Sequence, residues 1–367
     1  MRVFLSPPYL NGEEERRLVS AAFDSGYIAP CGPMVEAFEA EAARRFGFAG
    51  ALATTSGTMA LSLLARALEI GSGDVVIASD LTFIASVSPF ATRGARVVFV
   101  DAEPESWCLS PALVEEALAR YPEARAVIAT DLYGQCCDVP ALAAICARFG
   151  VKLIVDAAES VGSTCRGRPA GKGAWAAIHS FNGNKIITSG GGGMLLSDDA
   201  ELMALCRKLA MQAREPFPWY EHTRLGDHGR LGNIPAAIGL GQLRHLDEAL
   251  RDKARVWEAW RTRFATRSWV RLMPTAAYGV PNRWLTVVTL EGLSPFEAVA
   301  HLAERGIEAR PLWKPMHLQP VFREAPALLT GVDDRLFEQG LCLPSGRGLQ
   351  PEIMDEVIDL LDDLRRG

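Results

Sequence analysis

The chain contains the run Ala126-Val127-Ile128-Ala129-Thr130, then a segment from Pro140 to Phe149 with helical character, then the run Lys152-Leu153-Ile154-Val155-Asp156. Both runs are apolar along most of their length instead of alternating between apolar and polar residues. This pattern indicates strands that are covered on both faces. Two such strands joined by a helix form the repeating unit of a parallel sheet, so the stretch predicts an α/β fold.

The same alternation extends in both directions from this unit. Further strands are expected at Asp74 to Ala78, Arg96 to Val100, Trp175 to Ile178 and Met194 to Leu196. Helices are expected at Glu13 to Asp24, Pro33 to Phe46, Ser56 to Glu69, Thr82 to Thr92 and Pro111 to Arg120. Strands and helices in this order predict a doubly wound, mainly parallel sheet.

The pattern changes in the last part of the chain. A helix from Asp198 is followed by an irregular segment, Pro216 to Gly232, and then by a long predicted helix from Pro235 to Arg263. A strand at Trp284 to Leu290 and a helix at Pro295 to Arg305 indicate a smaller α+β domain. We therefore expect a large α/β domain at 1–245 and a small C-terminal domain at 246–367.

Composition excludes several classes of protein. The 367 residues are 49% hydrophobic and 22% charged, with a net charge of −6, which argues against non-specific nucleic-acid binding. No apolar run approaches the ~20 residues of a membrane span, and the N-terminus lacks a secretory segment. The eight cysteines form no CxxC spacing or Cys/His cluster, so we expect reduced thiols, no metal site and a cytoplasmic location.

One lysine stands in an unusual setting, Ser180-Phe181-Asn182-Gly183-Asn184-Lys185-Ile186-Ile187-Thr188-Ser189, which runs into four glycines. A lysine held there with few water contacts has a lowered pKa, and its amine becomes a usable nucleophile. Ser180 offers a hydroxyl to an anion. The alternative reading is a solvated surface lysine beside a glycine loop.

Three further features are expected at the carboxyl ends of the strands, where ligands bind in parallel α/β sheets. Each has an ordinary structural alternative. The segment Thr54-Thr55-Ser56-Gly57-Thr58-Met59-Ala60 suits a phosphate, or is a helix cap at Ser56. Asp156 is either a partner for a protonated ring nitrogen or a helix N-cap, and Phe83 either stacks on an aromatic ligand or packs in the core.

Together these features indicate pyridoxal phosphate. Lys185 would form a Schiff base with its aldehyde, and Asp156 would keep its ring nitrogen protonated. The ring then acts as an electron sink for carbanions at the attached amine carbon.

The chain also resembles the DegT/DnrJ-type sugar aminotransferases, which are fold-type I pyridoxal-phosphate enzymes. The resemblance covers nearly the whole chain and rests on six segments: Gly26-Tyr27-Ile28-Ala29-Pro30, Thr55-Ser56-Gly57-Thr58, Asp80-Leu81-Thr82-Phe83, Asp156-Ala157-Ala158-Glu159-Ser160, Ser180-Phe181-Asn182-Gly183-Asn184-Lys185 and Gly232-Asn233-Ile234-Pro235-Ala236-Ala237.

The resemblance implies a role for each matching residue. It makes Lys185 the aldimine lysine, Asp156 the pyridine-nitrogen partner and Glu159 the group that faces the ring hydroxyl. Phe83 would stack on the ring, and the phosphate would be held by Gly57, Thr58 and Ser180. Asn233 would reach the phosphate of the neighbouring subunit's cofactor, so the resemblance also implies a homodimer.

The Asn-Gly-Asn-Lys form and the segment Arg310 to Pro320 are most similar to one branch of the family. That branch aminates the 4-keto carbon of UDP-linked 4-keto-6-deoxy-N-acetylhexosamines. Arg310, Lys314 and His317 are then candidates for contact with the substrate's diphosphate or sugar. The alternative for Arg310 and Lys314 is a solvated loop.

The resulting hypothesis is a two-step aminotransferase. Glutamate gives its amine to the cofactor, and the pyridoxamine phosphate so formed aminates the keto carbon of a nucleotide-linked sugar. The alternatives are a 3-keto nucleotide sugar or keto-inositol as acceptor, and a silent pyridoxal-phosphate-binding regulator. Lys185 argues against the related dehydratases, which carry histidine there. The loop Gly226 to Asn233 lacks the family's usual tyrosine and asparagine, which points to a different sugar pocket if the loop lines it.

Overall fold

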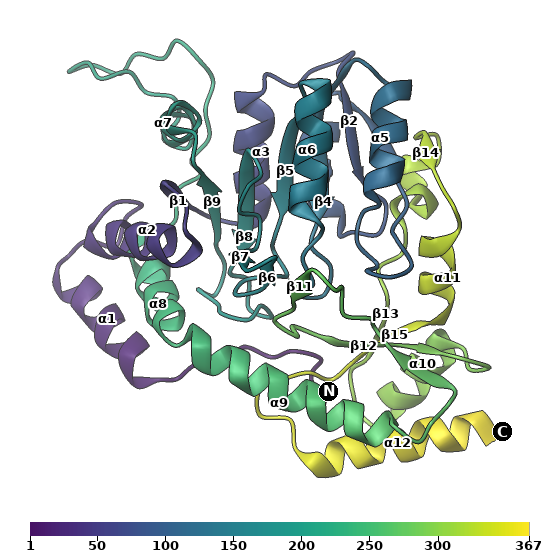
Figure 1. The fold of residues 1–367 in the computed structure, drawn as a ribbon. Helices are drawn as coiled ribbons and strands as arrows, with labels where there is room; N and C mark the ends of the chain where they lie inside the picture. Colours follow the sequence, from purple (N-terminus) through teal and green to yellow (C-terminus); the bar gives the residue numbers. More distant parts are fainter. Residues whose placement is uncertain (367) are drawn as a thin grey trace.

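A computed structural model describes residues 1–366 of the chain, which contain an eight-stranded sheet in the order β1-β9-β8-β5-β4-β2-β3-β14 (Figure 1). Six neighbouring strands, β8 to β14, run parallel, and β9 is antiparallel to both of its neighbours. The strand bounds are β1 Gly50–Thr54, β2 Val75–Ser79, β3 Arg96–Val100, β4 Ala124–Thr130, β5 Lys152–Asp156, β8 Ala176–Ser180, β9 Gly193–Ser197 and β14 Ala327–Leu328. The predicted mainly parallel sheet is confirmed.

Helices cover both faces of this sheet, as the continuous apolar character of its strands requires. One face packs against α3 (Gly57–Ala67), α4 (Ser88–Ala91) and α7 (Ala200–Leu209). The other packs against α2 (Pro33–Phe46), α5 (Pro111–Arg120), α6 (Val139–Phe149) and α8 (Asn233–Arg244), with α1 (Glu13–Asp24) outside α2 and α8. All five residues of β2 are buried, which is the expected consequence of two covered faces.

Two predicted helices differ from the structure. The segment Thr82 to Thr92 forms only a 3₁₀ turn, Ile84–Ser86, and the short α4. Its hydroxyl groups bond elsewhere, since Thr82 Oγ1 lies 2.8 Å from Thr130 Oγ1 and Ser86 Oγ donates to Asp156. The predicted helix from Pro235 to Arg263 is divided at His245 into α8 and α9 (Leu246–Phe264). The first turn of α9 still packs in the core that α8 joins, and the rest of α9 packs in the core of the small sheet.

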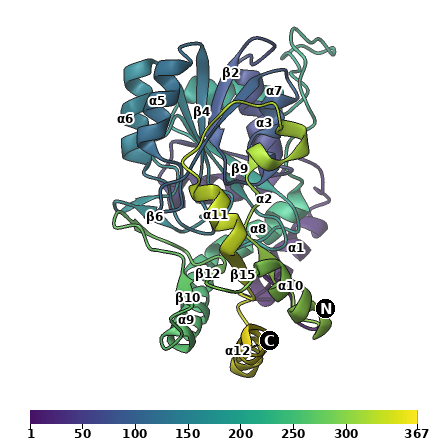
Figure 2. The same ribbon diagram turned by 90° about the vertical axis from the view of Figure 1, so that its right-hand side faces the viewer.

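The C-terminal part builds a second, smaller sheet. Its strands are antiparallel in the order β10-β12-β15-β13, with bounds Val270–Leu272, Thr286–Leu290, Gly340–Leu343 and Arg310–Pro311. Helices α9, α10 (Pro295–Glu304) and α12 (Pro351–Arg366) enclose its core, and α11 (Val332–Gln339) lies between this sheet and the large one (Figure 2). This arrangement is the expected α+β unit.

The chain crosses between the two units more often than a single division at residue 245 implies. That division falls at the α8–α9 break. However, Val3 pairs with Ile307 of the small unit, and β14 adds a parallel strand to β3 of the large sheet. Three two-residue strands, β11 (Gly279–Val280), β6 (Thr164–Cys165) and β7 (Arg168–Pro169), form a further small sheet at the junction.

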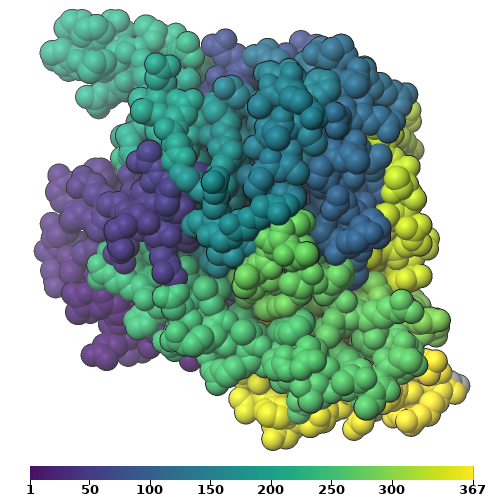
Figure 3. Space-filling model, in the orientation of Figure 1, coloured from purple at the N-terminus to yellow at the C-terminus, as the bar shows by residue number. Residues whose placement is uncertain are grey.

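An arm formed by residues 213–228 projects from the end of α7 and stands away from the body in the ribbon and space-filling views (Figures 1 and 3). It exposes four large apolar side chains, those of Phe217, Trp219, Tyr220 and Leu225. None of the helices in residues 1–366 has the length and apolar character needed to cross a bilayer.

Candidate active site

A cavity of about 430 Å³ lies at the carboxyl ends of the central parallel strands. Residues that follow or end β2, β4, β5 and β8 form its floor, and the N-terminus of α3 forms one wall. Trp284 and Trp313 close it from the side of the small sheet. The lining includes seven residues predicted for the site from sequence: Gly57, Thr58, Phe83, Asp156, Glu159, Ser180 and Lys185.

Lys185 enters the cavity from the loop after β8. Its Nζ lies 4.0 Å from the centroid of the Trp284 ring. Burial lowers the pKa of Lys185, while Glu159 and Asp156 act in the opposite direction. A lowered pKa increases the fraction of neutral amine, which is the form that attacks an aldehyde. The predicted setting for a nucleophilic lysine is therefore present.

The glycine run after Lys185 allows a close approach of two backbone segments. A Cβ atom on Gly193 would lie 2.4 Å from the amide nitrogen of Gly57, so only glycine fits where β9 begins beside α3. Phe181 N donates to Gly192 O at 2.8 Å, and Ser189 N donates to Phe181 O at 3.0 Å. These bonds fold the Lys185 loop back over the end of β8.

Asp156 ends β5 and is buried at the base of the cavity. Its Oδ2 accepts a hydrogen bond from Ser86 Oγ at 2.6 Å, and its Oδ1 accepts one from Ala158 N at 3.0 Å. Burial raises the pKa of Asp156, and the Ser86 bond partly opposes this. A buried carboxylate of this kind is stabilised by a cation, which a protonated ring nitrogen would supply.

Glu159 lies beside Asp156 and is held by two donors. Its Oε2 accepts from Tyr133 N at 2.7 Å, and its Oε1 accepts from Trp313 Nε1 at 3.2 Å. Burial raises the pKa of Glu159 to about 7. A carboxyl group that titrates near neutral pH can donate or accept a proton at a ligand hydroxyl.

The N-terminus of α3 is a capped helix end that also faces the cavity. Ser56 is the N-cap, and its hydroxyl accepts from Met59 N at 3.0 Å, so the capping alternative is correct. Gly57 and Thr58, in the first turn, line the cavity together with Ser180. Backbone amides of a first turn bind phosphate. Capping by Ser56 therefore leaves the first turn of α3 available for the predicted phosphate contact.

Phe83 does not pack in the core, which was its structural alternative. Its side chain is 51% exposed at the cavity wall, and its ring centroid lies 5.4 Å from that of Trp313. Exposed aromatic surface on a cavity wall suits a flat aromatic ligand. With the buried carboxylate, the lysine and the first turn of α3, the residues present fit pyridoxal phosphate.

Asn233 lies outside this cavity and is fully buried, with 0% of its surface exposed. Its Oδ1 accepts from Met34 N and Val35 N at 3.0 and 3.2 Å, and its Nδ2 donates to Tyr27 O at 2.7 Å. These bonds tie α8 to the start of α2. Because Asn233 is fully buried, a contact with a neighbouring subunit's cofactor would require the segments around it to move, although Nδ2 carries a second N–H group.

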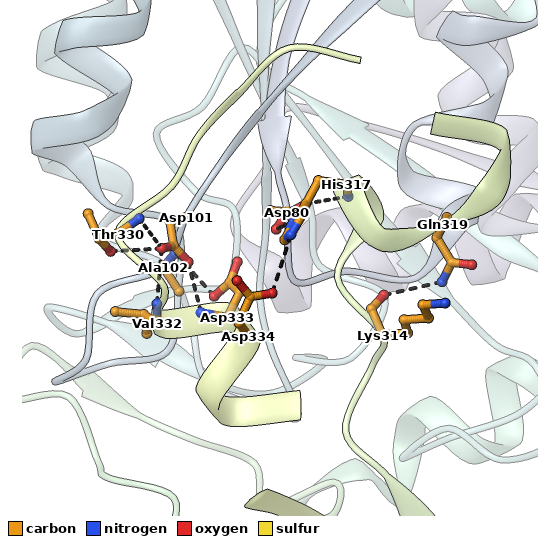
Figure 4. Close-up of polar contacts among 10 residues, drawn as sticks. All are labelled: Asp80, Asp101, Ala102, Lys314, His317, Gln319, Thr330, Val332, Asp333 and Asp334. Atoms are coloured by element: carbon orange, nitrogen blue, oxygen red, sulfur yellow. Dashed lines mark hydrogen bonds and ion pairs between the residues drawn. The ribbon is translucent and has the colours of Figure 1, made fainter. Parts of the chain in front are cut away.

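The three substrate candidates occupy three different settings. Arg310 lines a second cavity of about 550 Å³ and pairs with Glu308 at 2.9 Å. Lys314 is exposed at the surface. His317 lies between two carboxylates, with Nδ1 2.5 Å from Asp80 Oδ2 and Nε2 3.2 Å from Asp334 Oδ1 (Figure 4). The expectation that His317 contacts the substrate is not supported by this position, because both ring nitrogens are engaged inside the protein.

Sequence reasoning missed four residues of the site: Ser86, Tyr133, Trp284 and Trp313. Ser86 could have been found one helical turn after Thr82, behind a strand end. The three aromatic residues come from separate loops, and their rings stack only in the folded chain, with centroids 6.5 Å apart for Tyr133 and Trp284 and 6.1 Å apart for Tyr133 and Trp313. Their sequence neighbourhoods carry no signal for this contact.

The doubly wound sheet, the buried lysine with its two carboxylates and the first turn of α3 define a pyridoxal-phosphate-dependent enzyme. The model of the DegT/DnrJ/EryC1/StrS aminotransferase family matches residues 10–362. The chain therefore belongs to this family of pyridoxal-phosphate-dependent sugar aminotransferases.

Individual relatives agree with this assignment over nearly their full lengths. The chain is 43% identical to "Putative pyridoxal phosphate-dependent aminotransferase EpsN" of Bacillus subtilis, covering 98% of this chain and 95% of that protein. It is 36% identical to the GDP-perosamine synthase of Caulobacter vibrioides, covering 99% and 98%. The aminotransferase TlmJ of Streptoalloteichus hindustanus superposes with a TM-score of 0.91 at 29% identity, covering 98% and 97%.

Proposed function

We propose that this enzyme transfers the amino group of glutamate to the 4-keto carbon of a nucleotide-linked 4-keto-6-deoxy sugar, with UDP as the nucleotide. The observation that carries the proposal is the placement of Lys185 with Asp156 and Glu159 in one buried cavity. The family acts on nucleotide sugars. The sugar and nucleotide named here rest on the resemblance of the segment Arg310 to Pro320.

The cavity residues divide the work of binding. Amides of Gly57 and Thr58 and the hydroxyl of Ser180 would hold the phosphate, Asp156 would hold the ring nitrogen and Phe83 would contact the ring. Bound pyridoxal phosphate supplies an electron sink for the carbon that bears the amine. Ser86 orients Asp156 through the 2.6 Å bond to Oδ2.

Lys185 is the group that moves protons. Its lowered pKa leaves part of the amine neutral, so Nζ can take a proton from the substrate carbon and return one. The ring of Trp284 and the side chains of Asp156 and Glu159 confine it. Trp284 and Trp313 exclude water from the same space.

A second cavity supports a large substrate. Its volume of about 550 Å³ adjoins the first, since both are lined by Asn184, Trp284 and Trp313. Mostly apolar side chains line it, and Arg310 stands at its exposed edge. An apolar space suits a nucleoside, and Arg310 would bind the diphosphate by exchanging its ion pair with Glu308 for one with the phosphates.

The absorbance of Lys185→Ala tests the assignment of the lysine. The wild-type protein with pyridoxal phosphate should show the visible band of a lysine-bound cofactor, and glutamate should discharge it. Lys185→Ala should retain the cofactor without this band and lose turnover. A visible band and full turnover in the variant would contradict the role of Lys185.

The acceptor is tested with purified nucleotide sugars. The protein charged with glutamate should aminate a UDP-linked 4-keto-6-deoxy sugar faster than the GDP- and dTDP-linked forms and faster than 3-keto sugars or a keto-inositol. Preference for another nucleotide would show that the proposed nucleotide is wrong, and the proposed amino transfer to a keto sugar would still hold. A cofactor band that no amino donor discharges would favour the silent regulator.

A further inference from the structure

We propose that Lys253 is a positioning residue for Lys185. It holds Ser6 and Trp284, which together fix the carbonyl group of Asn184 and so the point from which the Lys185 side chain enters the cavity. The proposal rests on the assignment of Lys185 as the amine that attaches the cofactor.

Lys253 is a buried lysine on α9, with 3% of its surface exposed. Its Nζ donates to Ser6 Oγ at 3.1 Å, to Trp284 O at 3.0 Å and to Ser345 O at 2.6 Å. An ammonium group has three N–H donors, and each of them has one of these neutral oxygens as a partner. Lys253 therefore joins three separate segments of the chain at one point.

Two of these segments bond to the residue before Lys185. Ser6 Oγ donates to Asn184 O at 3.0 Å, and Trp284 Nε1 donates to the same oxygen at 2.7 Å. The ring of Trp284 also lies against Lys185 Nζ. A displacement of Ser6 or Trp284 would thus move the Asn184 carbonyl, the start of the Lys185 side chain and the surface on which its amine rests.

Lys253 lies in a place that disfavours its charge. Burial and the nearby Arg347 lower the pKa of Lys253 to about 7. Arg347 itself pairs with Asp252 at 2.6 Å and with Glu248 at 3.3 Å, so these carboxylates are already engaged. A buried cation with neutral partners is an inefficient way to stabilise a fold, because an apolar side chain would avoid the cost of desolvation. The hydrogen bonds donated by Lys253 fix the positions of Ser6 and Trp284, which an apolar side chain at this position could not do.

The test measures two quantities separately: the rate at which pyridoxal phosphate becomes attached to Lys185, and the affinity of the site for the cofactor without attachment. Lys253→Met keeps an unbranched apolar side chain as far as Cε and removes the amine with its N–H donors. Stopped-flow absorbance measures how fast the visible band grows when pyridoxal phosphate is mixed with apoenzyme. Tryptophan fluorescence measures the affinity for pyridoxamine phosphate, which uses the same phosphate and ring contacts but has no aldehyde to react with Lys185.

Lys253→Met should slow growth of the band by about tenfold or more, because a misplaced nucleophile reacts slowly. Its affinity for pyridoxamine phosphate should stay within about twofold of the wild type, since the first turn of α3 and Asp156 are untouched. Lys152→Met is the matched control. Lys152 is an exposed lysine at the start of β5, and its replacement should change neither quantity.

Ser6→Ala provides a second variant that retains the charge of Lys253. Ser6→Ala should lower the rate of band growth less than Lys253→Met does. In the double variant, Ser6→Ala with Lys253→Met, the rate should fall by less than the two separate factors multiplied together, because both residues act through Asn184. If Lys253→Met fails to fold, the rate of band growth and the pyridoxamine phosphate affinity of Ser6→Ala test the proposal instead. An unchanged rate in the folded variants, or a parallel loss of pyridoxamine phosphate affinity, would overturn the proposal.

Lys185→Ala distinguishes this inference from the proposed function. If Lys185→Ala forms no band and Lys253→Met behaves as the wild type, only the role of Lys253 is wrong. If Lys185→Ala still forms the band, the assignment of Lys185 and the inference both fail.

Discussion

Burial controls the charge of the acidic residues at the base of the cavity. Glu159 and Asp156 are both buried beside Lys185, and burial raises the pKa of each carboxyl group. For Glu159 the value rises from 4.5 to about 7. Neutral pH is therefore the range in which the charge of this pocket changes, and the change involves a residue that lines the cavity.

The shift at Glu159 predicts a pH dependence of stability in the apoenzyme. Between pH 4.5 and 7 the folded protein retains a proton that the unfolded chain has released, so the free energy of unfolding falls as pH rises through this window. Glu159→Gln cannot titrate. Between pH 5 and 8 the wild type should lose about 3 kcal/mol more stability than the variant. Urea denaturation of both apoenzymes at the two pH values measures this difference, and equal losses would contradict it.

At the level of elements, the segment that returns from the small sheet is anchored to the ends of β2 and β3. His317 bonds to Asp80 directly after β2, and Asp101 after β3 accepts bonds from Thr330 and from the start of α11 (Figure 4). The neighbouring Asp80 raises the pKa of His317. These contacts place Trp313 over the cavity, where its N and Nε1 bond to Tyr133 and Glu159.

Asp101 caps α11 from a distant part of the chain, and its removal should be costly. Its Oδ2 accepts from Thr330 N, Thr330 Oγ1 and Val332 N at 2.6, 2.7 and 3.1 Å, and its Oδ1 accepts from Asp333 N at 2.9 Å. Asp101→Ala leaves the buried amides of Val332 and Asp333 unpaired and should lower the free energy of unfolding by about 3 kcal/mol. Asp101→Asn keeps one acceptor and should lose less. Urea denaturation measures both, and wild-type stability of Asp101→Ala would refute the capping role.

At the scale of the whole molecule, the arm at 213–228 has no core of its own to bury its aromatic side chains. Phe217 and Trp219 stack with ring centroids 5.1 Å apart, yet both remain exposed beside Tyr220 and Leu225. Exposed aromatic clusters of this kind are typical of interfaces. A second copy of this chain is the partner that the predicted homodimer requires.

The arm therefore gives a test of that homodimer. The wild type should sediment as a dimer, and a double variant with Trp219→Ser and Tyr220→Ser should dissociate at concentrations more than about tenfold higher than the wild type does. Val321→Ser, which changes an exposed apolar residue outside the arm, should have no effect. Sedimentation measured over a dilution series compares the three proteins. A monomeric wild type, or a double variant with unchanged association, would count against the prediction.

The local sequence pattern was sufficient to predict the bounds of a helix or strand where the whole element packs in a single environment. The runs Arg96–Val100 and Lys152–Asp156 and the helix Pro111–Arg120 were predicted with their observed bounds, since strands covered on both faces and a helix begun by proline leave clear marks in sequence. The helices expected at Thr82 to Thr92 and across His245 were wrong. In both places, distant partners compete with local helix formation.

The sequence by itself determined the mainly parallel sheet and put the candidate site residues at its carboxyl edge, because the positions and ends of strands follow from apolar periodicity and from the residues next to it. Only the tertiary structure decided which distant side chains surround them. It brought Ser86 to Asp156, Trp313 to Glu159 and Trp284 to Lys185, and it placed His317 between two aspartates instead of at the cavity. The physical reason is that burial and hydrogen bonding depend on contacts between segments far apart in the chain, and these contacts leave no local pattern.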